Sequence, residues 1–250
     1  MTSWVMCLII ANAIVYLLSM LQPAVREAFA FVPAHILEQP WTLITYMFLH
    51  AKGFGHIVFN MLGLLFFGPR LEAFLGGKRF LFLYFFSGLV AALTSCVLSP
   101  QSSIIGASGA VYGVFLGFAR MWPREIIRIW GVFPIEARWM AVLMTALSLF
   151  GGLGMTGGNI AHFAHLGGFI GAYIYLRFLE RSLAQSSQRK ETRVQISKGD
   201  LARWSGIDRA RLHEVNREEY DRIRQKLDQQ AGTITEGERQ FLDRFSQTGR

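Results

Sequence analysis

Charged side chains are scarce in most of this chain. Lys, Arg, Asp and Glu make up 17% of its 250 residues, whereas ordinary soluble domains contain about 25%. The few charges are also unevenly spread, since 15 of the 25 basic and 11 of the 17 acidic residues lie in 181–250. With 52% hydrophobic residues, this shortage excludes an ordinary soluble domain for the first 180 residues and indicates a membrane protein.

Cysteine is equally scarce, because Cys7 and Cys96 are the only two. Both lie inside apolar segments, so neither indicates a disulfide or a metal site. The sequence contains no close cluster of His, Cys and carboxylates with metal-ligand spacing and no glycine-rich phosphate loop. We therefore expect no metal ion and no other cofactor.

Long apolar runs are what the first part of the chain has instead. A helix needs roughly 20 apolar residues to cross the hydrocarbon layer. Six segments meet or approach this length, and the fourth is short: about 4–22, 56–75, 79–98, 106–121, 138–155 and 159–178. The predicted fold class is all-α, a polytopic membrane protein with a six-transmembrane-helix bundle.

The basic residues of the short loops alternate along the chain. Loops 99–105 and 152–158 contain no charge, whereas Lys and Arg flank the ends of the second, fourth and sixth segments. Cytoplasmic loops carry the excess of Lys and Arg. The pattern therefore predicts that both termini are cytoplasmic, in a multi-pass protein of the cell (inner) membrane.

Four polar residues interrupt the apolar segments. His56 and Asn60 begin the second segment, Ser108 begins the fourth, and His165 lies about six residues into the sixth. Polar and ionisable groups at membrane depth are costly, which makes them functional candidates. Because these three segments all run inward from the outer face, we expect the four side chains in the outer third of the membrane.

Glycine spacing predicts which helices touch. Gly109, Gly113 and Gly117 recur every four residues in the fourth segment, as do Gly167 and Gly171, beside Gly168, in the sixth. Such stripes allow close approach of transmembrane helices, and packing of the fourth segment on the sixth would bring Ser108 to His165. Taken alone, the stripes are also compatible with general helix packing.

These residue types suit nucleophilic catalysis. A serine hydroxyl becomes a strong nucleophile when an adjacent base accepts its proton, and His165 is the candidate base, with His162 as a competitor. No Asp or Glu lies in the fourth or sixth segment to orient the imidazole, which favours a dyad over a triad. The helix N-terminus at Ser108, with His56 and Asn60, would stabilise an oxyanion. Taken singly, each residue is also compatible with a helix-packing hydrogen bond.

At these residues the chain resembles the rhomboid family of intramembrane serine proteases. The similarity lies in three motifs in register, over roughly residues 1–180: His56-Ile-Val-Phe-Asn60, Gly106-Ala-Ser108-Gly109-Ala-Val-Tyr112-Gly113, and Ala164-His165-Leu-Gly-Gly168. One departure is that Thr42 follows Trp41, where the family often has arginine.

The resemblance implies a role for each of these residues. Ser108 would be the nucleophile and His165 the base, since the spacing to Gly168 favours His165 over His162. His56, Asn60 and the Ser108 N–H would form the oxyanion hole. Tyr112 would pack on the His165 ring, and Gly106, Gly109 and Gly168 would support the site. The 23–55 loop would lie partly in the outer leaflet, and the fifth span would be a mobile side gate for substrate.

The last part of the chain has a different composition. We expect a transmembrane catalytic domain at 1–180, a polar linker at 181–207 and a small soluble helical hairpin at 208–250, similar to the C-terminal extension of some bacterial rhomboid-like proteins. Tyr220, Ile223 and Leu227 form one apolar helix face, and Thr235 with Glu238 forms a capping box. The excess positive charge is modest, so attraction to lipid headgroups is a sufficient account of it, and we expect no nucleic acid partner.

The sequence therefore predicts a serine endopeptidase that cleaves transmembrane segments of other proteins near the outer face, with those proteins and the lipid bilayer as its partners. Two alternatives belong to other classes. One is a non-catalytic rhomboid-like protein that binds transmembrane helices, which the intact Ser108 and His165 argue against. The other is a small-molecule transporter, which would show inverted repeats that this sequence lacks.

Overall fold

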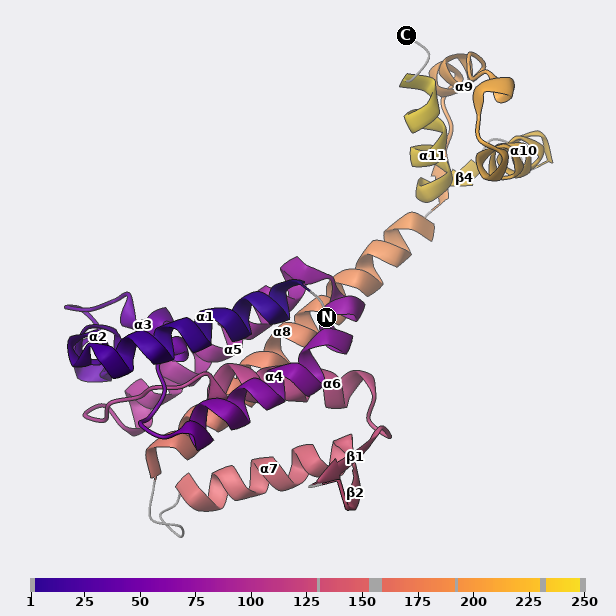
Figure 1. Ribbon diagram of the computed structural model, residues 1–250. Helices are drawn as coiled ribbons and strands as arrows, with labels where there is room; N and C mark the ends of the chain where they lie inside the picture. Colours follow the sequence, from indigo (N-terminus) through magenta and orange to yellow (C-terminus); the bar gives the residue numbers. More distant parts are fainter. Residues whose placement is uncertain (1–2, 130, 153–158, 192, 230–232, 248–250) are drawn as a thin grey trace. The chain divides into compact units, whose positions relative to one another are not determined.

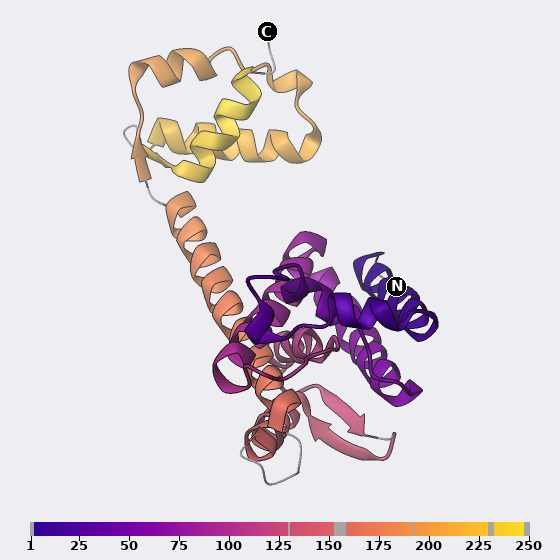
Figure 2. The ribbon, with the colours of Figure 1, turned by 90° about the vertical axis from the view of Figure 1, so that its left-hand side faces the viewer.

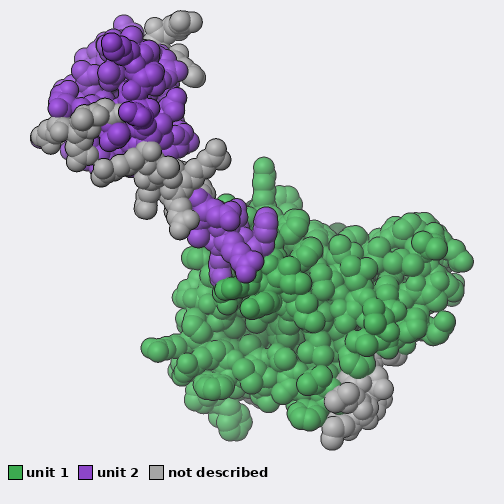
Figure 3. Space-filling model, turned by 180° about the vertical axis from the view of Figure 1, so that it is seen from behind, with its two compact units in different colours: residues 1–177 green, residues 178–250 purple. Residues whose placement is uncertain are grey.

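The protein is mainly α-helical (Figure 1). The computed structural model describes residues 3–129, 131–152, 159–191, 193–229 and 233–247. The chain divides into two compact units, residues 1–177 and 178–250, which Figure 3 colours separately. The all-α prediction is confirmed, and two small two-stranded sheets accompany the helices.

Within the described residues, each apolar segment predicted from the sequence is a helix, and residues 153–155 of the fifth segment lie outside them. In chain order the helices are α1 (Ser3–Leu21), α4 (Phe54–Leu75), α5 (Gly77–Leu98), α6 (Ser108–Met121), α7 (Ala137–Gly152) and α8 (Asn159–Glu191). Among the described residues, α1, α4 and α5 have the length and apolar composition needed to cross a membrane. The helix α6 has only 14 residues, in agreement with the short fourth segment. The chain is a multi-pass membrane protein.

The loop between α1 and α4 contains short helical turns and is held at several points. Its elements are α2 (Pro23–Phe29), η1 (Pro33–His35), α3 (Thr42–Thr45) and η2 (Tyr46–Phe48). Trp41 Nε1 donates to Ala28 O over 2.9 Å, and Thr42, which is buried, donates to Gln39 O over 2.5 Å. Trp41 therefore joins two turns of this loop, whereas Thr42, at the position where the family often has arginine, makes a local hydrogen bond.

A buried carboxylate fixes the start of α1. Glu72 of α4 accepts hydrogen bonds from the backbone N–H groups of Trp4 and Val5, at 3.2 and 3.0 Å. The first N–H groups of a helix have no acceptor within the helix, and an acidic group there also suits the helix dipole. Glu72 is thus a cap supplied by another helix, and it joins α1 to α4.

The segment between α6 and α7 forms a β-hairpin that the sequence interpretation, which considered only its basic residues, did not predict. Strand β1 (Ile126–Ile129) pairs antiparallel with β2 (Phe133–Glu136), with Ile129 opposite Phe133; Figure 2 shows the two strands side by side. Gly131 lies in the connecting turn at φ 73°, which suits a short hairpin loop.

The glycine stripes pack differently from the prediction. Gly109 and Gly113 of α6 lie between α5 and α8: a Cβ added at either would come nearest to Ala91 or Ser87 of α5, and next to the carbonyl oxygens of Ala164 or Gly168 of α8. However, Gly117 faces Leu71 of α4 and Leu83 of α5. Gly167 and Gly171 face α5, at Thr94 and Val90 respectively. The prediction was therefore right in part for Gly109 and Gly113, which contact both α5 and α8, and wrong for Gly117, Gly167 and Gly171, because four helices (α4, α5, α7 and α8) lie around α6.

The C-terminal unit has its own apolar core. Besides α10 (Glu214–Gln229) and α11 (Glu236–Gln247), which occupy the region of the expected hairpin, it contains α9 (Lys198–Trp204), η3 (Arg209–Arg211) and a sheet of β3 (Arg193–Gln195) with β4 (Thr233–Thr235). Trp204 is fully buried beside Ile223 and Leu242. The segment expected as a polar linker thus contributes α9 and a core tryptophan, since a single aromatic in a polar run gives no periodic signal.

The capping box predicted in this unit is confirmed. Thr235 N–H donates to Glu238 Oε2 over 2.7 Å, and Glu238 N–H donates to Thr235 Oγ1 over 3.2 Å. A second box, between Ser197 and Asp200, begins α9. The predicted apolar face of α10 is also confirmed, because Tyr220 and Ile223 are buried and Leu227 packs against them.

Candidate active site

A glycine with positive φ leads into the first turn of α6. Gly106 has φ 119°, a conformation that L-residues with side chains rarely adopt. Its N–H donates to the carbonyl of Tyr46 over 2.9 Å, and the Tyr46 hydroxyl donates to Gly88 O over 2.8 Å. Ser108 follows as the first residue of α6. Its backbone N–H therefore belongs to the group at a helix N-terminus that has no acceptor within the helix.

The structure brings Ser108 and His165 together. His165 Nε2 lies 2.8 Å from Ser108 Oγ, within hydrogen-bonding distance. The close approach of α6 and α8 at Gly109 and Gly168 makes this possible, since a side chain at Gly168 would collide with the Gly109 carbonyl. For Nε2 to accept the serine proton, the imidazole must carry its own hydrogen on Nδ1. His165 Nδ1 is buried without a hydrogen-bond partner among the described residues.

Tyr112, one turn after Ser108 on α6, stacks on the His165 ring. The ring centroids are 4.1 Å apart and the planes differ by 13°. Phe169 of α8 also contacts the Tyr112 ring, with 5.0 Å between the ring centroids. The imidazole is therefore oriented by an aromatic contact, and no carboxylate is among the described residues that line the site.

His56 lies against Gly106 with one ring nitrogen directed to a backbone donor. Ala51 N–H donates to His56 Nδ1 over 3.2 Å, so the neutral ring carries its hydrogen on Nε2. A Cβ at Gly106 would lie 2.8 Å from His56 Nε2 and Cε1. The ring thus occupies the space that the glycine leaves open, and its Nε2–H is a donor beside the Ser108 turn.

Asn60 lies one turn below His56 and is buried. Its amide nitrogen donates to His56 O over 2.7 Å. An amide NH2 group carries two donors, so one N–H remains after this bond. Asn60, His56, Ser108 and His165 line the same cavity.

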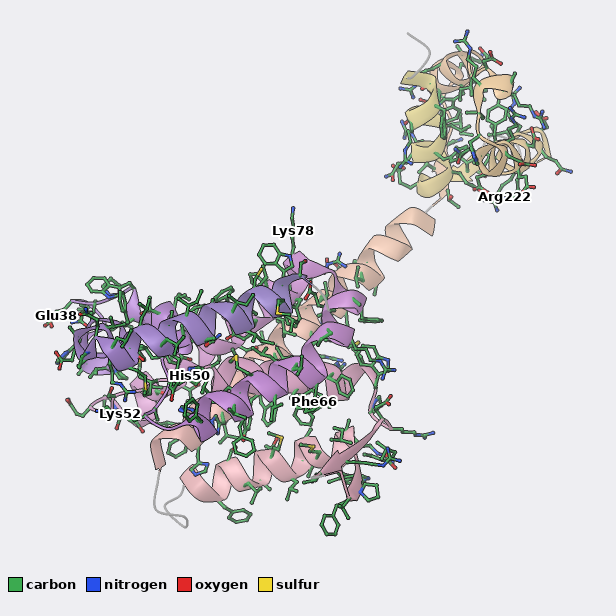
Figure 4. The ribbon with its side chains drawn as sticks, in the orientation of Figure 1. Glu38, His50, Lys52, Phe66, Lys78 and Arg222 are labelled. Atoms are coloured by element: carbon green, nitrogen blue, oxygen red, sulfur yellow. The ribbon has the colours of Figure 1, made fainter. Side chains whose placement is uncertain are left out.

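The cavity has a volume of about 1040 Å³ and extends well beyond these residues. Its walls come from α4, α6, α7, α8, the β1–β2 hairpin, residues 103–106 and Tyr46, and its lining is mostly apolar. Figure 4 labels Phe66, one of the lining residues, on the side of α4 that faces α7. The sequence did not predict the contributions of the hairpin or of Met140 and Met144 of α7.

Two further histidines lie close by. His162 packs its ring near Gly151 of α7 and meets the His165 ring at 90°, with 6.2 Å between centroids. Of the two candidates for the base, His165 is the one whose ring nitrogen lies within hydrogen-bonding distance of Ser108 Oγ. His50, labelled in Figure 4, is fully buried, and its ring meets that of His56 at a centroid distance of 5.1 Å. Sequence reasoning passed over His50, although it precedes His56 by only six positions.

Comparison with known proteins identifies the family of this chain. A family model described as "Rhomboid domain" matches residues 37–182, more than half of the chain. The chain belongs to the rhomboid family. The match includes the four polar residues, the hairpin and most of the bundle.

Individual relatives are identical to this rhomboid chain at about one aligned residue in three. They include the "Rhomboid-like protease 3" of Toxoplasma gondii, with 33% identity over 145 residues, 56% of this chain and 52% of that protein. The "Putative rhomboid protease YdcA" of Bacillus subtilis (strain 168) has 34% identity over 142 residues, 56% of this chain and 66% of that protein. The "RHOMBOID-like protein 2" of Arabidopsis thaliana has 33% identity over 133 residues, which are 53% of this chain and 40% of that protein. The chain thus spans between 40% and 66% of these relatives' lengths.

Proposed function

We propose that this rhomboid chain is an intramembrane serine endopeptidase that cleaves transmembrane segments of other membrane proteins near the outer face. The observation that carries the proposal is the 2.8 Å separation of His165 Nε2 and Ser108 Oγ in the wall of a large apolar cavity. Two of the relatives are named as proteases, one of them putatively, which supports the reaction class.

The first step of the proposed reaction is acylation of Ser108. Its oxygen attacks the scissile carbonyl carbon while His165 Nε2 takes the hydroxyl proton. The resulting oxyanion receives hydrogen bonds from the Ser108 N–H, the His56 Nε2–H and the second N–H of Asn60. The C–N bond then breaks as His165 returns the proton to the leaving nitrogen, and an ester on Ser108 remains.

Deacylation repeats the same proton transfers with water. A water molecule in the cavity gives a proton to His165 as it attacks the ester carbonyl. When the ester bond breaks, His165 returns that proton to Ser108 Oγ, and the second product leaves as a carboxylic acid that then loses its remaining proton to water. Both steps need only Ser108 and His165 as proton carriers, so we propose a dyad that Tyr112 orients by stacking.

The membrane arrangement follows from the same proposal. Both termini would be cytoplasmic, as the loop charges predict, and the N-terminal ends of α4 and α6 would lie at the outer face of the cell membrane. Residues 1–180 would form the catalytic domain, joined through 181–207 to a soluble helical extension. Substrate would enter beside α7, whose Met140 and Met144 line the cavity.

Labelling with a fluorophosphonate tests the function without a known substrate. Membranes containing the unsubstituted chain should label on Ser108, because only an activated serine reacts readily with this electrophile. Labelling should disappear in Ser108→Ala and fall by at least a hundredfold in His165→Ala, whereas His162→Ala should still label. An unsubstituted chain that does not label would overturn the proposal and favour a non-catalytic protein that binds transmembrane helices.

A further inference from the structure

Residues of the β1–β2 hairpin line the cavity, beyond the C-terminal end of α6, whereas Ser108 lies at the N-terminal end of that helix. Helix α6 rises about 20 Å between Ser108 and Met121, at about 1.5 Å per residue, and the hairpin follows directly. Ile127, Arg128 and Ile129 of β1 line the same cavity as Ser108 and His165. One continuous space therefore has the serine at one end and a charged hairpin at the other.

Between these ends the cavity is an apolar groove. Phe59 and Phe66 of α4, which line it, are 61% and 67% exposed, and Met140 and Met144 of α7 line it as well. The lining residues of α4 begin at Gly55 and end at Phe67, a rise of about 18 Å. A substrate helix lying in the groove would therefore place a residue about 12 positions from the scissile bond at the hairpin.

Arg128 has no ionic partner among the residues that the structure describes. The acidic residues at the base of the hairpin are paired elsewhere, Glu125 with Arg70 at 2.7 Å and Glu136 with Arg138 at 2.7 Å. The residue opposite Arg128 in the sheet is Pro134. The groove thus ends at the exposed guanidinium of Arg128, and the carboxylates near it are already paired with other arginines.

The base of the hairpin is held in place from α4. Arg70 pairs with Glu125 and also lies over the Trp122 ring, 4.2 Å from its centroid. Glu125 O in turn accepts the N–H of Ala137, the first residue of α7. These contacts fix both strands relative to the groove, so Arg128 is presented at a defined distance from Ser108.

We propose that Arg128 determines substrate specificity by recognising a carboxylate on the helix flank that lies about 12 residues from the scissile bond. The inference rests on the proposed function, since it requires the substrate helix to bind in the groove. Lys and Arg commonly flank the cytoplasmic end of transmembrane helices. Arg128 repels such flanks and pairs with acidic ones, so the hairpin selects by repulsion as well as by attraction.

Binding to an inactivated chain tests this proposal. The full chain carrying Ser108→Ala is placed in phosphatidylcholine liposomes with a synthetic transmembrane peptide that bears a photocrosslinker at its scissile end. Three peptides differ only at positions 12 and 13 from that end, which are Asp-Asp, Ser-Ser or Lys-Lys. Crosslinking against peptide concentration should give the tightest binding for Asp-Asp, by about fivefold over Lys-Lys, because exposed ion pairs are worth little more.

Charge reversal supplies the decisive comparison. Arg128→Glu should invert the order of the three peptides, and Arg128→Gln should abolish the preference. Arg124→Glu is the matched control, since Arg124 is an exposed arginine just before the hairpin that does not line the cavity, and it should keep the order. An unchanged order in Arg128→Glu, or equal binding of all three peptides, would overturn the proposal.

A register experiment leaves the hairpin unsubstituted. Moving the Asp pair six residues along the peptide displaces it by about 9 Å, which should remove the preference over Ser-Ser. A preference that survives this shift overturns the assignment to Arg128. Because binding is measured without cleavage, a chain that never labels with fluorophosphonate contradicts only the proposed chemistry. A chain that cleaves with no charge preference contradicts only this inference.

Discussion

The ring of Tyr112 lies almost parallel to that of His165, with 4.1 Å between their centroids. The two residues come from different helices, α6 and α8, and the contact holds the imidazole with Nε2 on the Ser108 hydroxyl. Since the described site offers no carboxylate to orient this histidine, the stacking takes that positioning role in our proposal.

The first prediction concerns this contact. Tyr112→Ala should slow fluorophosphonate labelling by up to about tenfold, because an aromatic pair is worth about 0.5–1.5 kcal/mol. Tyr112→Phe should retain at least half of the rate, since the stacking needs the ring and not the hydroxyl. Equal losses in both variants would show that the hydroxyl, rather than the ring, supports the site.

The second prediction concerns the glycine before Ser108. Gly106→Ala should abolish labelling, because the added Cβ meets the His56 ring at 2.8 Å and the backbone is at φ 119°. Gly76→Ala is the control, since Gly76 also has positive φ (81°) but has no atom within 4 Å of an added Cβ. Both variants should lose about 1–2 kcal/mol of stability from backbone strain, and only Gly106→Ala should lose activity. A fully active Gly106→Ala would contradict the proposed position of His56.

The third prediction tests the oxyanion donors. Asn60→Ala should lower kcat for a model transmembrane substrate by about a hundredfold with little change in KM, because the donor acts on charge that develops in the transition state. Asn12→Ala is a matched control. Asn12 is also buried and also donates to the carbonyl four residues earlier, Leu8 O, over 2.8 Å, but it does not line the cavity. If the two variants lose the same activity, the effect of Asn60 is structural.

The fourth prediction concerns the stability of the C-terminal unit at low pH. Burial by itself raises the pKa of Glu238, but hydrogen bonds from Lys226 and Thr235 more than offset this, so that the pKa lies below its ordinary value of 4.5. A depressed carboxyl pKa contributes stability that is present above the ordinary pKa and is lost as the pH falls through the folded pKa. Hydrogen exchange in α10 and α11, corrected for intrinsic rates, should therefore accelerate below about pH 4.5.

Two variants of the full chain complete this experiment. Glu238→Gln should exchange faster at neutral pH and show a weaker pH dependence, because the charged acceptor is missing throughout. Glu219→Gln removes a more exposed carboxylate that pairs with Arg222, and it should behave like the unsubstituted chain. The same pH dependence in Glu238→Gln as in the unsubstituted chain would show that other groups cause the transition.

The sequence by itself determined the helices and the candidate residues of the site. Apolar runs are local features, so the six segments predicted from them correspond to helices among the described residues. Gly106 and Gly109 are local as well, and they indicated that Ser108 begins a short helix. The capping box at Thr235 and Glu238 is equally local, because its hydrogen bonds join residues three positions apart.

Only the tertiary structure decided which surfaces meet. Glycine spacing shows that another helix can approach closely, but it does not show which helix does so. In the structure Gly167 and Gly171 pack on α5, whereas Gly168 packs on α6. The hairpin of β1 and β2 depends on pairing across a turn, and the burial of Trp204 depends on residues as distant as Leu242. Apart from the hairpin, which is local, these contacts join segments far apart in sequence, and they stabilise the protein only once the chain has folded.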